Sequence, residues 1–194
     1  MLRPFPCLVL LLLSGCAMEH AFDHVVDNVF GHNLPPIPPG SAAYRLGPGD
    51  TVRLITYGED GLSGEFRVSA AGTIAMPLLG GVRAAGLTPT ELGESVAEAL
   101  KREKLLQSPS VAAEVTAYRP IFVLGEVNKP GEYPYQPGMT VVTAAAVAGG
   151  FTYRAVEGYV SVVRTVDGKA VEGKAMRQTY LQPGDVVTVY ERWF

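Results

Sequence analysis

The sequence predicts an α+β protein built from two small β-rich modules, and three observations indicate this class. Short runs in which apolar residues alternate with polar ones recur through most of the chain, as in strands that bury one face. Many of the 22 glycines and 15 prolines fall between these runs and mark turns. Two stretches, residues 88–105 and 141–148, have the length of helices, and sheets that pack against single helices form α+β folds.

Length and composition limit the classes of function. With 194 residues, of which 47% are hydrophobic and 18% charged, the chain can bury a core in one domain or in two small ones. Its formal net charge of -3 supplies no basic field, and no Lys/Arg run is interleaved with aromatic residues. We therefore expect no nucleic-acid partner.

Residues 1–15 have the form of an export signal, with a basic start at Arg3, an apolar run over Phe5–Leu13 and small residues before Cys16. The apolar run is shorter than the about 20 residues that span a bilayer. The string LSGC resembles the lipobox of bacterial lipoproteins, which implies cleavage between Gly15 and Cys16 and acylation of the cysteine. A thiolate is the nucleophile that such acylation needs. The alternative is an ordinary secretory signal with an incidental cysteine.

The mature chain is then expected to be anchored to a membrane without spanning it, because several acyl chains hold a protein firmly. Ala17 follows the cysteine, and in bacterial lipoproteins an aspartate at that position is the usual inner-membrane retention signal. The resemblance therefore implies the outer membrane. Cys7 leaves with the signal and Cys16 carries lipid, so no disulfide is expected.

Residues 16–43 are predicted to be a tether, and the folded body is expected to begin near Tyr44. The stretch LPPIPPGSAA, residues 34–43, has the composition of an extended proline-rich spacer. His20 and His24 are spaced as on one helical face, but the folded body has no cysteine or further histidine to complete a metal site. We expect no bound metal and no cofactor.

The first module, residues 44–117, alternates as short strands do, at Val52/Leu54, Phe66/Val68 and Ile74/Met76. A helix follows. Thr88 is the predicted N-cap and Glu91 the capping-box residue, with Pro89 at the first helical position. Leu92, Val96 and Leu100 then recur on one face, and the helix is expected to end near Leu105. The string SVAAEVTAY is predicted to be a strand that leads into the second module.

The second module, residues 118–194, opens with the apolar strand PIFVLGEV. The alanine-rich helix at 141–148 has Thr140 as N-cap and two glycines as its stop. YVSVVRTV is predicted to be a strand, DGKAVEGKAMRQ a hydrophilic hairpin or loop, and DVVTVYERWF the last strand. Strands with one packed helix indicate a compact β-grasp unit.

A unit x-Pro-Gly-x occurs four times and predicts type II turns, since proline fixes φ at the second position and glycine supplies a positive φ at the third. The residues concerned are Pro48, Gly49, Asp50, Pro130, Gly131, Pro137, Gly138, Pro183, Gly184 and Asp185. Asp50 and Asp185 are expected to accept backbone N–H bonds as the turn enters a strand. A catalytic carboxylate pair is the alternative, but neither has a histidine, serine or metal-ligand neighbour.

One module begins with LGPGDTVRLI and the other ends with LQPGDVVTVY. The shared motif is therefore local and does not indicate a tandem repeat. YRLGPGDTVRL, GTIAMPLLGGVRAAGLTPTELGESVAEAL and SPSVAAEV together resemble the polysaccharide export domain of outer-membrane polysaccharide export lipoproteins. VLGEVNKPGEYPYQPGMTVVTAAAVAGG and LQPGDVVTV are similar to the soluble-ligand-binding β-grasp (SLBB) module that follows it in that family. With the lipobox, the resemblance covers nearly the whole mature chain.

The resemblance implies a homo-oligomeric ring, octameric in the best-known members, that carries capsular polysaccharide or exopolysaccharide across the periplasm and outer membrane. It also implies docking onto an inner-membrane polysaccharide co-polymerase. Larger members have further β-grasp modules and a C-terminal amphipathic helix, whereas this sequence has one module and stops at Phe194. We therefore expect a lipid-anchored periplasmic collar, with another protein supplying passage through the outer membrane.

Two other functions compete with export. The first is a monomeric periplasmic lipoprotein that binds a soluble sugar or peptidoglycan through its β-grasp module, with stacking faces at Tyr133, Tyr135, Phe151 and Tyr153. The second is an enzyme such as a glycan hydrolase, which needs two carboxylates in a cleft. The sequence has no G-x-S-x-G or HExxH string, and its acidic residues lie in turns, caps and loops. We therefore expect no enzymatic activity.

Overall fold

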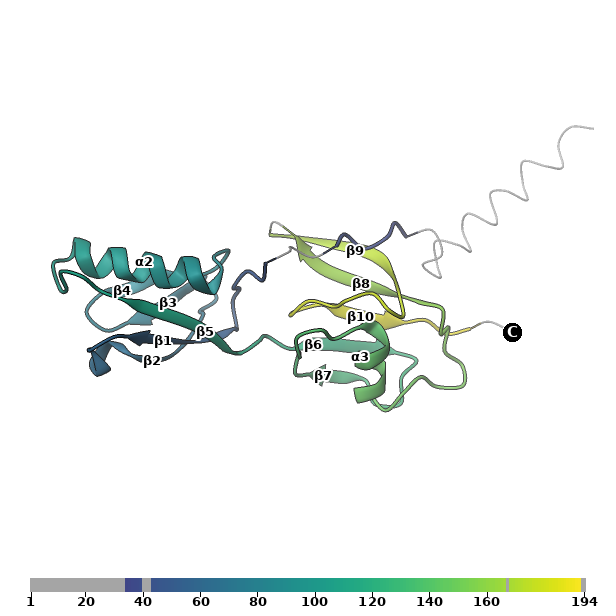
Figure 1. Cartoon of the computed structure of the whole chain (residues 1–194). Helices are drawn as coiled ribbons and strands as arrows, with labels where there is room; N and C mark the ends of the chain where they lie inside the picture. The colour runs from purple at the N-terminus through teal and green to yellow at the C-terminus, as the bar shows by residue number, and fades with distance from the viewer. Residues whose placement is uncertain (1–33, 40–42, 167, 193–194) are drawn as a thin grey trace, which may run out of the picture.

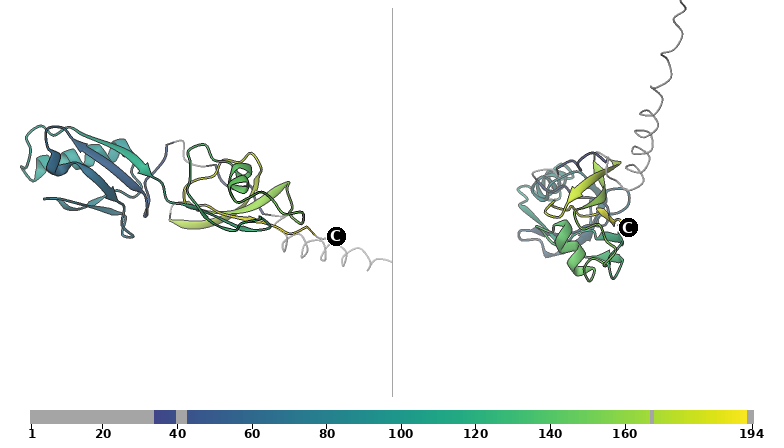
Figure 2. Two further views of the ribbon diagram at one scale, coloured as in Figure 1. Left: turned by 90° about the horizontal axis from the view of Figure 1, so that it is seen from below. Right: turned by 90° about the vertical axis from the view of Figure 1, so that its right-hand side faces the viewer.

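Figure 1 shows the computed structural model of the chain, in which residues 34–39, 43–166 and 168–192 are described. The described residues are mostly sheet with two α-helices, so the predicted α+β class is confirmed. Two separate hydrophobic cores define a first domain, residues 43–117, and a second domain, residues 34–39 and 118–192. The two domains lie end to end (Figure 2). The predicted signal, Gly15, Cys16 and the three histidines lie outside the described residues.

The first domain contains a three-stranded antiparallel sheet and a separate hairpin. The sheet has the order β2-β1-β5, with β1 at Thr51–Thr56, β2 at Gly64–Arg67 and β5 at Val111–Ala117. A short 3₁₀ turn, η1 at Asp60–Leu62, follows β1, and the hairpin pairs β3 (Thr73–Met76) with β4 (Gly80–Arg83). Alternate residues of β1 and β3 are buried, as the period-two pattern requires.

Helix α2, Pro89–Arg102, covers the sheet of the first domain. Thr88 and Glu91 form a reciprocal capping box, in which the Thr88 hydroxyl accepts from the Glu91 N–H and the Glu91 carboxylate accepts from the Thr88 N–H. The bond from the Thr88 backbone lowers the pKa of Glu91. The helix ends three residues before the predicted end near Leu105, where Lys104 adopts a φ of 59°.

The second domain has a five-stranded mixed sheet of order β7-β6-β10-β8-β9 with α3, Val141–Val147, on one face (Figure 1). The strands are β6 (Ile121–Gly125), β7 (Gly131–Tyr133), β8 (Tyr159–Val166), β9 (Lys169–Met176) and β10 (Val186–Val189). Only β6 and β10 pair in parallel within the described sheet. The segment predicted as a hairpin or loop is strand β9, which pairs with β8 along its whole length.

The N-terminal segment 34–39 differs from the prediction of a free spacer. It lies beside β9, where Ile37 N donates to Lys174 O at 2.9 Å and Lys174 N donates to Pro35 O at 2.7 Å. Ile37 joins the second core, and Gly173 makes room for it, because a Cβ there would lie 2.7 Å from the Ile37 Cα. Prolines are tolerated on such a sheet edge, since the outer side needs no N–H donor. The folded body thus includes residues before Tyr44.

Three of the four x-Pro-Gly-x units are reversals of direction, and the fourth is not. Gly49, Gly138 and Gly184 have φ values of 98°, 84° and 86°, and each unit closes with an i+3 to i backbone hydrogen bond. Gly131 has no positive φ and lies in β7 opposite Val123. The prediction of a turn at Pro130 and Gly131 is therefore wrong, because pairing with β6 holds the chain extended there. Among the described helices, none is long and apolar enough to cross a membrane.

Candidate functional site at the interdomain junction

Two turns that are remote in sequence approach each other where the domains meet. The first LxPGD turn is Leu46–Asp50 and the second LxPGD turn is Leu181–Asp185. The chain crosses between the domains through Tyr118, Arg119 and Pro120, from the end of β5 to the start of β6 (Figure 1). We call these two turns, together with Tyr44 and residues 118–120, the interdomain junction.

In the first turn, Asp50 is fully buried and accepts hydrogen bonds from several donors. One oxygen accepts from the Gly47 N–H at 2.8 Å, as expected for this turn, and also from the Tyr44 hydroxyl. The backbone N–H of Arg119 donates to the other oxygen at 2.9 Å, and its Nη1 lies 3.3 Å from the first. Burial, followed by the hydrogen bond to Asp50, raises the pKa of the Tyr44 phenol, which therefore stays protonated as a donor.

In the second turn, Asp185 forms a buried two-pronged ion pair. It accepts from the Gln182 N–H at 2.8 Å, from Arg164 Nε at 3.0 Å and from Arg164 Nη2 at 2.6 Å. The side chains of Arg164 and Asp185 are only 3% and 1% exposed. Arg164 Nη1 also donates to the carbonyl of Pro38, and Nη2 donates to the carbonyl of Tyr180. Arg164 thus joins β8, the second turn and the N-terminal segment.

Arg119 contacts both turns. Besides Asp50, it reaches the second turn, where its Nε donates to Pro183 O at 2.8 Å. Two glycines make this possible: a Cβ at Gly184 would lie 2.8 Å from the Arg119 Nε, and a Cβ at Gly47 would collide with the Nη1. One side chain therefore links the two domains between two glycines, and a side chain at either glycine would have to displace the Arg119 guanidinium.

Three tyrosines form a row across the same junction. Tyr44 and Tyr118 meet edge to face with ring centroids 5.0 Å apart, and Tyr118 and Tyr135 do so at 5.5 Å. Such pairs add about 0.5–1.5 kcal/mol each beyond their area burial. Burial also raises the pKa of Tyr135. The row gives the junction a second set of contacts in addition to those of Arg119.

Most of the aromatics expected as sugar-stacking faces are engaged within the domain. Tyr133, Tyr135 and Phe151 are partly buried against the second core. Tyr135 contacts Tyr118, and the Arg177 guanidinium lies 5.9 Å from the Phe151 ring centre. Tyr153 is 81% exposed. The four rings therefore do not present a common stacking platform.

The chemistry of the junction is structural. Both carboxylates are shielded from solvent, and no buried side-chain N or O atom of the described residues lacks a hydrogen-bond partner. Nor do the described residues bring together three His, Cys, Asp or Glu side chains in an arrangement that could hold a metal ion.

Sequence reasoning missed both arginines. Arg164 is the only charged residue of the apolar strand YVSVVRTV, and that position could have indicated a buried ion pair. Arg119 follows no such pattern, because its partners come from both domains.

Comparison with known proteins assigns both domains. Residues 38–116 match the model of the polysaccharide biosynthesis/export protein family, and residues 120–177 match the SLBB domain. The chain belongs to the polysaccharide export family. Residues 117–119 separate the two matched regions of this export-family chain, so Arg119 of the interdomain junction lies between them.

Relatives of this export-family chain include exopolysaccharide proteins. It is 34% identical over 120 residues to the exopolysaccharide production protein ExoF of Rhizobium meliloti, covering 55% of this chain and 28% of ExoF. It is 31% identical over 138 residues to the EPS I polysaccharide export outer membrane protein EpsA of Ralstonia solanacearum, covering 66% of this chain and 36% of EpsA. The EpsA of Ralstonia nicotianae is 32% identical over 105 residues, covering 53% of this chain and 27% of that protein. The chain thus spans about a third of the length of these relatives.

Proposed function

We propose that this chain is a non-enzymatic component of a polysaccharide export machinery of the outer membrane, where several copies form a periplasmic ring around the exported polymer. The observation that carries the proposal is the order of its two domains, an export domain followed by an SLBB domain. The relatives, an exopolysaccharide production protein and a polysaccharide export outer membrane protein, agree with it.

The junction supports a role as a repeating building block. A closed ring requires every copy to present its surfaces at the same angle, because heterologous contacts close only when the rotation is fixed. In this chain Arg119 and the tyrosine row connect the two domains through several contacts at once. A sugar polymer needs a wide polar passage, and a chain of this size cannot enclose one alone, whereas several copies around an axis can.

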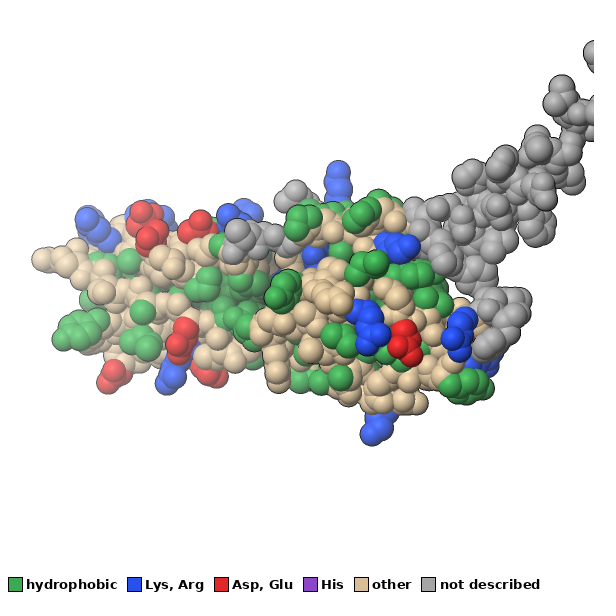
Figure 3. All heavy atoms as spheres, turned by 45° about the vertical axis from the view of Figure 1, so that its right-hand side comes forward, with side chains coloured by type: hydrophobic (Ala, Val, Ile, Leu, Met, Phe, Trp, Pro, Cys, Tyr) green, Lys and Arg blue, Asp and Glu red, His purple; other side chains and the backbone are tan. Residues whose placement is uncertain are grey.

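The charged side chains on the exposed surface support a location of the described residues in water, such as the periplasm. On the face drawn in Figure 3, acidic and basic side chains are interspersed with apolar ones over both domains. Acylation of Cys16 is proposed as the membrane anchor, and an inner-membrane co-polymerase as the partner that delivers the polymer. The monomeric sugar-binding alternative has less support, because three of its four candidate aromatics are packed within the domain.

The test is a deletion of the gene with complementation. Loss of the chain should abolish extracellular polysaccharide while its lipid-linked precursor is still made, and the full chain supplied in trans should restore export. Cys16→Ser should leave the protein out of the outer-membrane fraction and reduce export. Normal polysaccharide secretion in the deletion strain would refute the proposal.

A further inference from the structure

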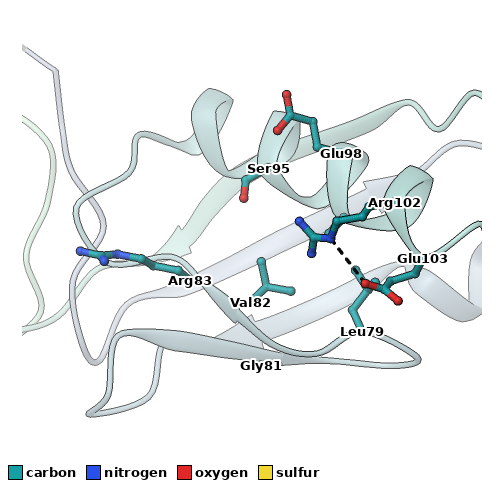
Figure 4. Close-up of a pocket in the computed structure, with 9 residues that line it drawn as sticks. Leu79, Gly81, Val82, Arg83, Ser95, Glu98, Arg102 and Glu103 are labelled. Carbon is teal, nitrogen blue, oxygen red and sulfur yellow. Dashed lines mark hydrogen bonds and ion pairs between the residues drawn. The ribbon is translucent and has the colours of Figure 1, made fainter.

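A hollow of about 220 Å³ lies in the first domain between the β3–β4 hairpin and the C-terminal half of α2 (Figure 4). This volume lies below the about 300–1,000 Å³ of typical drug-sized sites. Val82 and Ala99, each almost fully buried, are among the residues that line it. A space of this size suits one small polar unit rather than an extended ligand.

The hairpin leaves polar backbone accessible at this place. Within the described residues β4 pairs only with β3, so its other edge has N–H and C=O groups that no strand satisfies. Gly81 lies on β4 and lines the hollow, and a Cβ there would have no atom within 4 Å. A ligand can therefore approach the strand backbone without meeting a side chain.

The side chains around the hollow have unused hydrogen-bond donors. The Arg102 guanidinium lies over it in Figure 4, and its contact is with the adjacent Glu103 at 3.4 Å, a pair that is largely exposed. Ser95 points its hydroxyl toward the hollow, whereas the Glu98 carboxylate turns away from it. Arg83 pairs with Thr73 through its backbone at the end of β4, and its guanidinium has no hydrogen bond or ion pair with any described residue. Two arginines and two glutamates thus line the hollow; Glu103 pairs with Arg102, and the Glu98 carboxylate turns away from the hollow.

We infer that this hollow binds a single carboxylate-bearing sugar unit, such as a hexuronic acid residue, within the exported polysaccharide. The guanidinium of Arg102 has the planar, two-pronged geometry that matches a carboxylate, and Arg83 adds positive charge at one end. The Ser95 hydroxyl and the free edge of β4 are suited to the sugar hydroxyls. The inference rests on the proposed export function, and it adds a preference for acidic polymers.

Weak binding is expected, because a transported polymer must leave each site that it enters. Saturation-transfer NMR on the full chain in mild detergent can detect affinities near ~1 mM. The probes are cellobiouronic acid and cellobiose, which differ in one carboxylate. We expect saturable binding of the acid that is about tenfold tighter than that of the neutral sugar, and loss of this preference in Arg102→Gln, as removal of a charged hydrogen bond predicts.

Two further variants separate the site from general charge and folding effects. Lys101→Gln removes the same charge one residue earlier, outside the lining, and should bind like the parent. Ser95→Leu, at a position whose side chain points toward the hollow, should fill it and abolish binding while both arginines remain. Equal binding of the two sugars, absence of saturable binding, or an equal loss in Lys101→Gln would overturn the inference. The binding results test only the sugar site, and export by the complemented strain does not depend on them. Normal export by the deletion strain would refute the proposed export function but would not bear on sugar binding at the hollow.

Discussion

The two LxPGD turns share their local structure and differ in what surrounds it. In both, the leucine and the aspartate are buried, and the aspartate accepts from the N–H three residues earlier at 2.8 Å. Asp185 pairs with Arg164 of its own domain, which is 3% exposed, whereas Asp50 pairs with Arg119 of the connecting segment, which is 26% exposed. The same LxPGD motif therefore forms a core element in one domain and an interdomain contact in the other, depending on which arginine contacts the turn.

The largest effect is expected from breaking the buried pair of the second turn. Arg164→Met leaves Asp185 buried without its cation and should lower the free energy of unfolding by about 3–5 kcal/mol. Urea denaturation measures this. The double variant Arg164→Met with Asp185→Leu should recover much of the loss, since it removes both charges. A loss below about 1 kcal/mol in the single variant would contradict the comparison, because that is the value of an exposed pair.

The next largest effect on stability is expected from comparing Gly184 with Gly131, two glycines of x-Pro-Gly-x units whose backbone conformations differ. Gly184→Ala places a side chain at a φ of 86° and within 2.8 Å of Arg119 Nε, so a loss of about 1–3 kcal/mol is expected. Gly131→Ala is the matched control, because position 131 is extended with no atom near its Cβ, and it should change stability by less than about 0.5 kcal/mol. Thermal unfolding distinguishes them, and equal losses would show that 131 is also a required turn.

Removal of the Arg119 side chain should cost less in stability than removal of Arg164. Asp50 keeps three donors in Arg119→Ala, since the Gly47 N–H, the Tyr44 hydroxyl and the backbone N–H of residue 119 remain. We expect a loss of about 1 kcal/mol with faster hydrogen exchange at the amides of residues 47–50 and 182–185. Arg177→Ala, which breaks an exposed pair with Glu157 in the second domain, is the control and should leave those amides unchanged. Unchanged exchange in Arg119→Ala would show that Arg119 does not hold the junction.

The smallest expected effect is on how the free energy of unfolding depends on alkaline pH through the ionisation of Tyr44. Its folded-state pKa is raised by burial and by the bond to Asp50, so its contribution is complete below about pH 10 and is lost as the pH rises further. The free energy of unfolding should therefore fall more steeply above that pH in the parent than in Tyr44→Phe. Denaturation at pH 8 to 11 measures both slopes, and identical slopes would contradict the raised pKa.

Local sequence patterns predicted most helices and strands. The features that they did not predict depend on contacts between residues that are distant in sequence. The sequence Thr88-Pro89-Thr90-Glu91 gives the start of α2 because a capping box needs only nearby residues. The docking of residues 34–39 depends on Gly173 and the edge of β9, which no local pattern of the N-terminal segment indicates. The turn expected at Pro130 and Gly131 is overridden by pairing with β6. The role of Arg119 follows only from the approach of two turns that the sequence separates.

The proposal that this chain acts as a ring is tested most directly by the mass of the particle extracted from outer membranes in mild detergent. Native mass spectrometry or light scattering should find one closed assembly of several copies, with a mass that does not change over a wide range of concentrations. The Arg119→Ala variant should give a broader or smaller distribution, since the angle between its domains is less fixed. A particle with the mass of a single chain at every concentration would contradict the account.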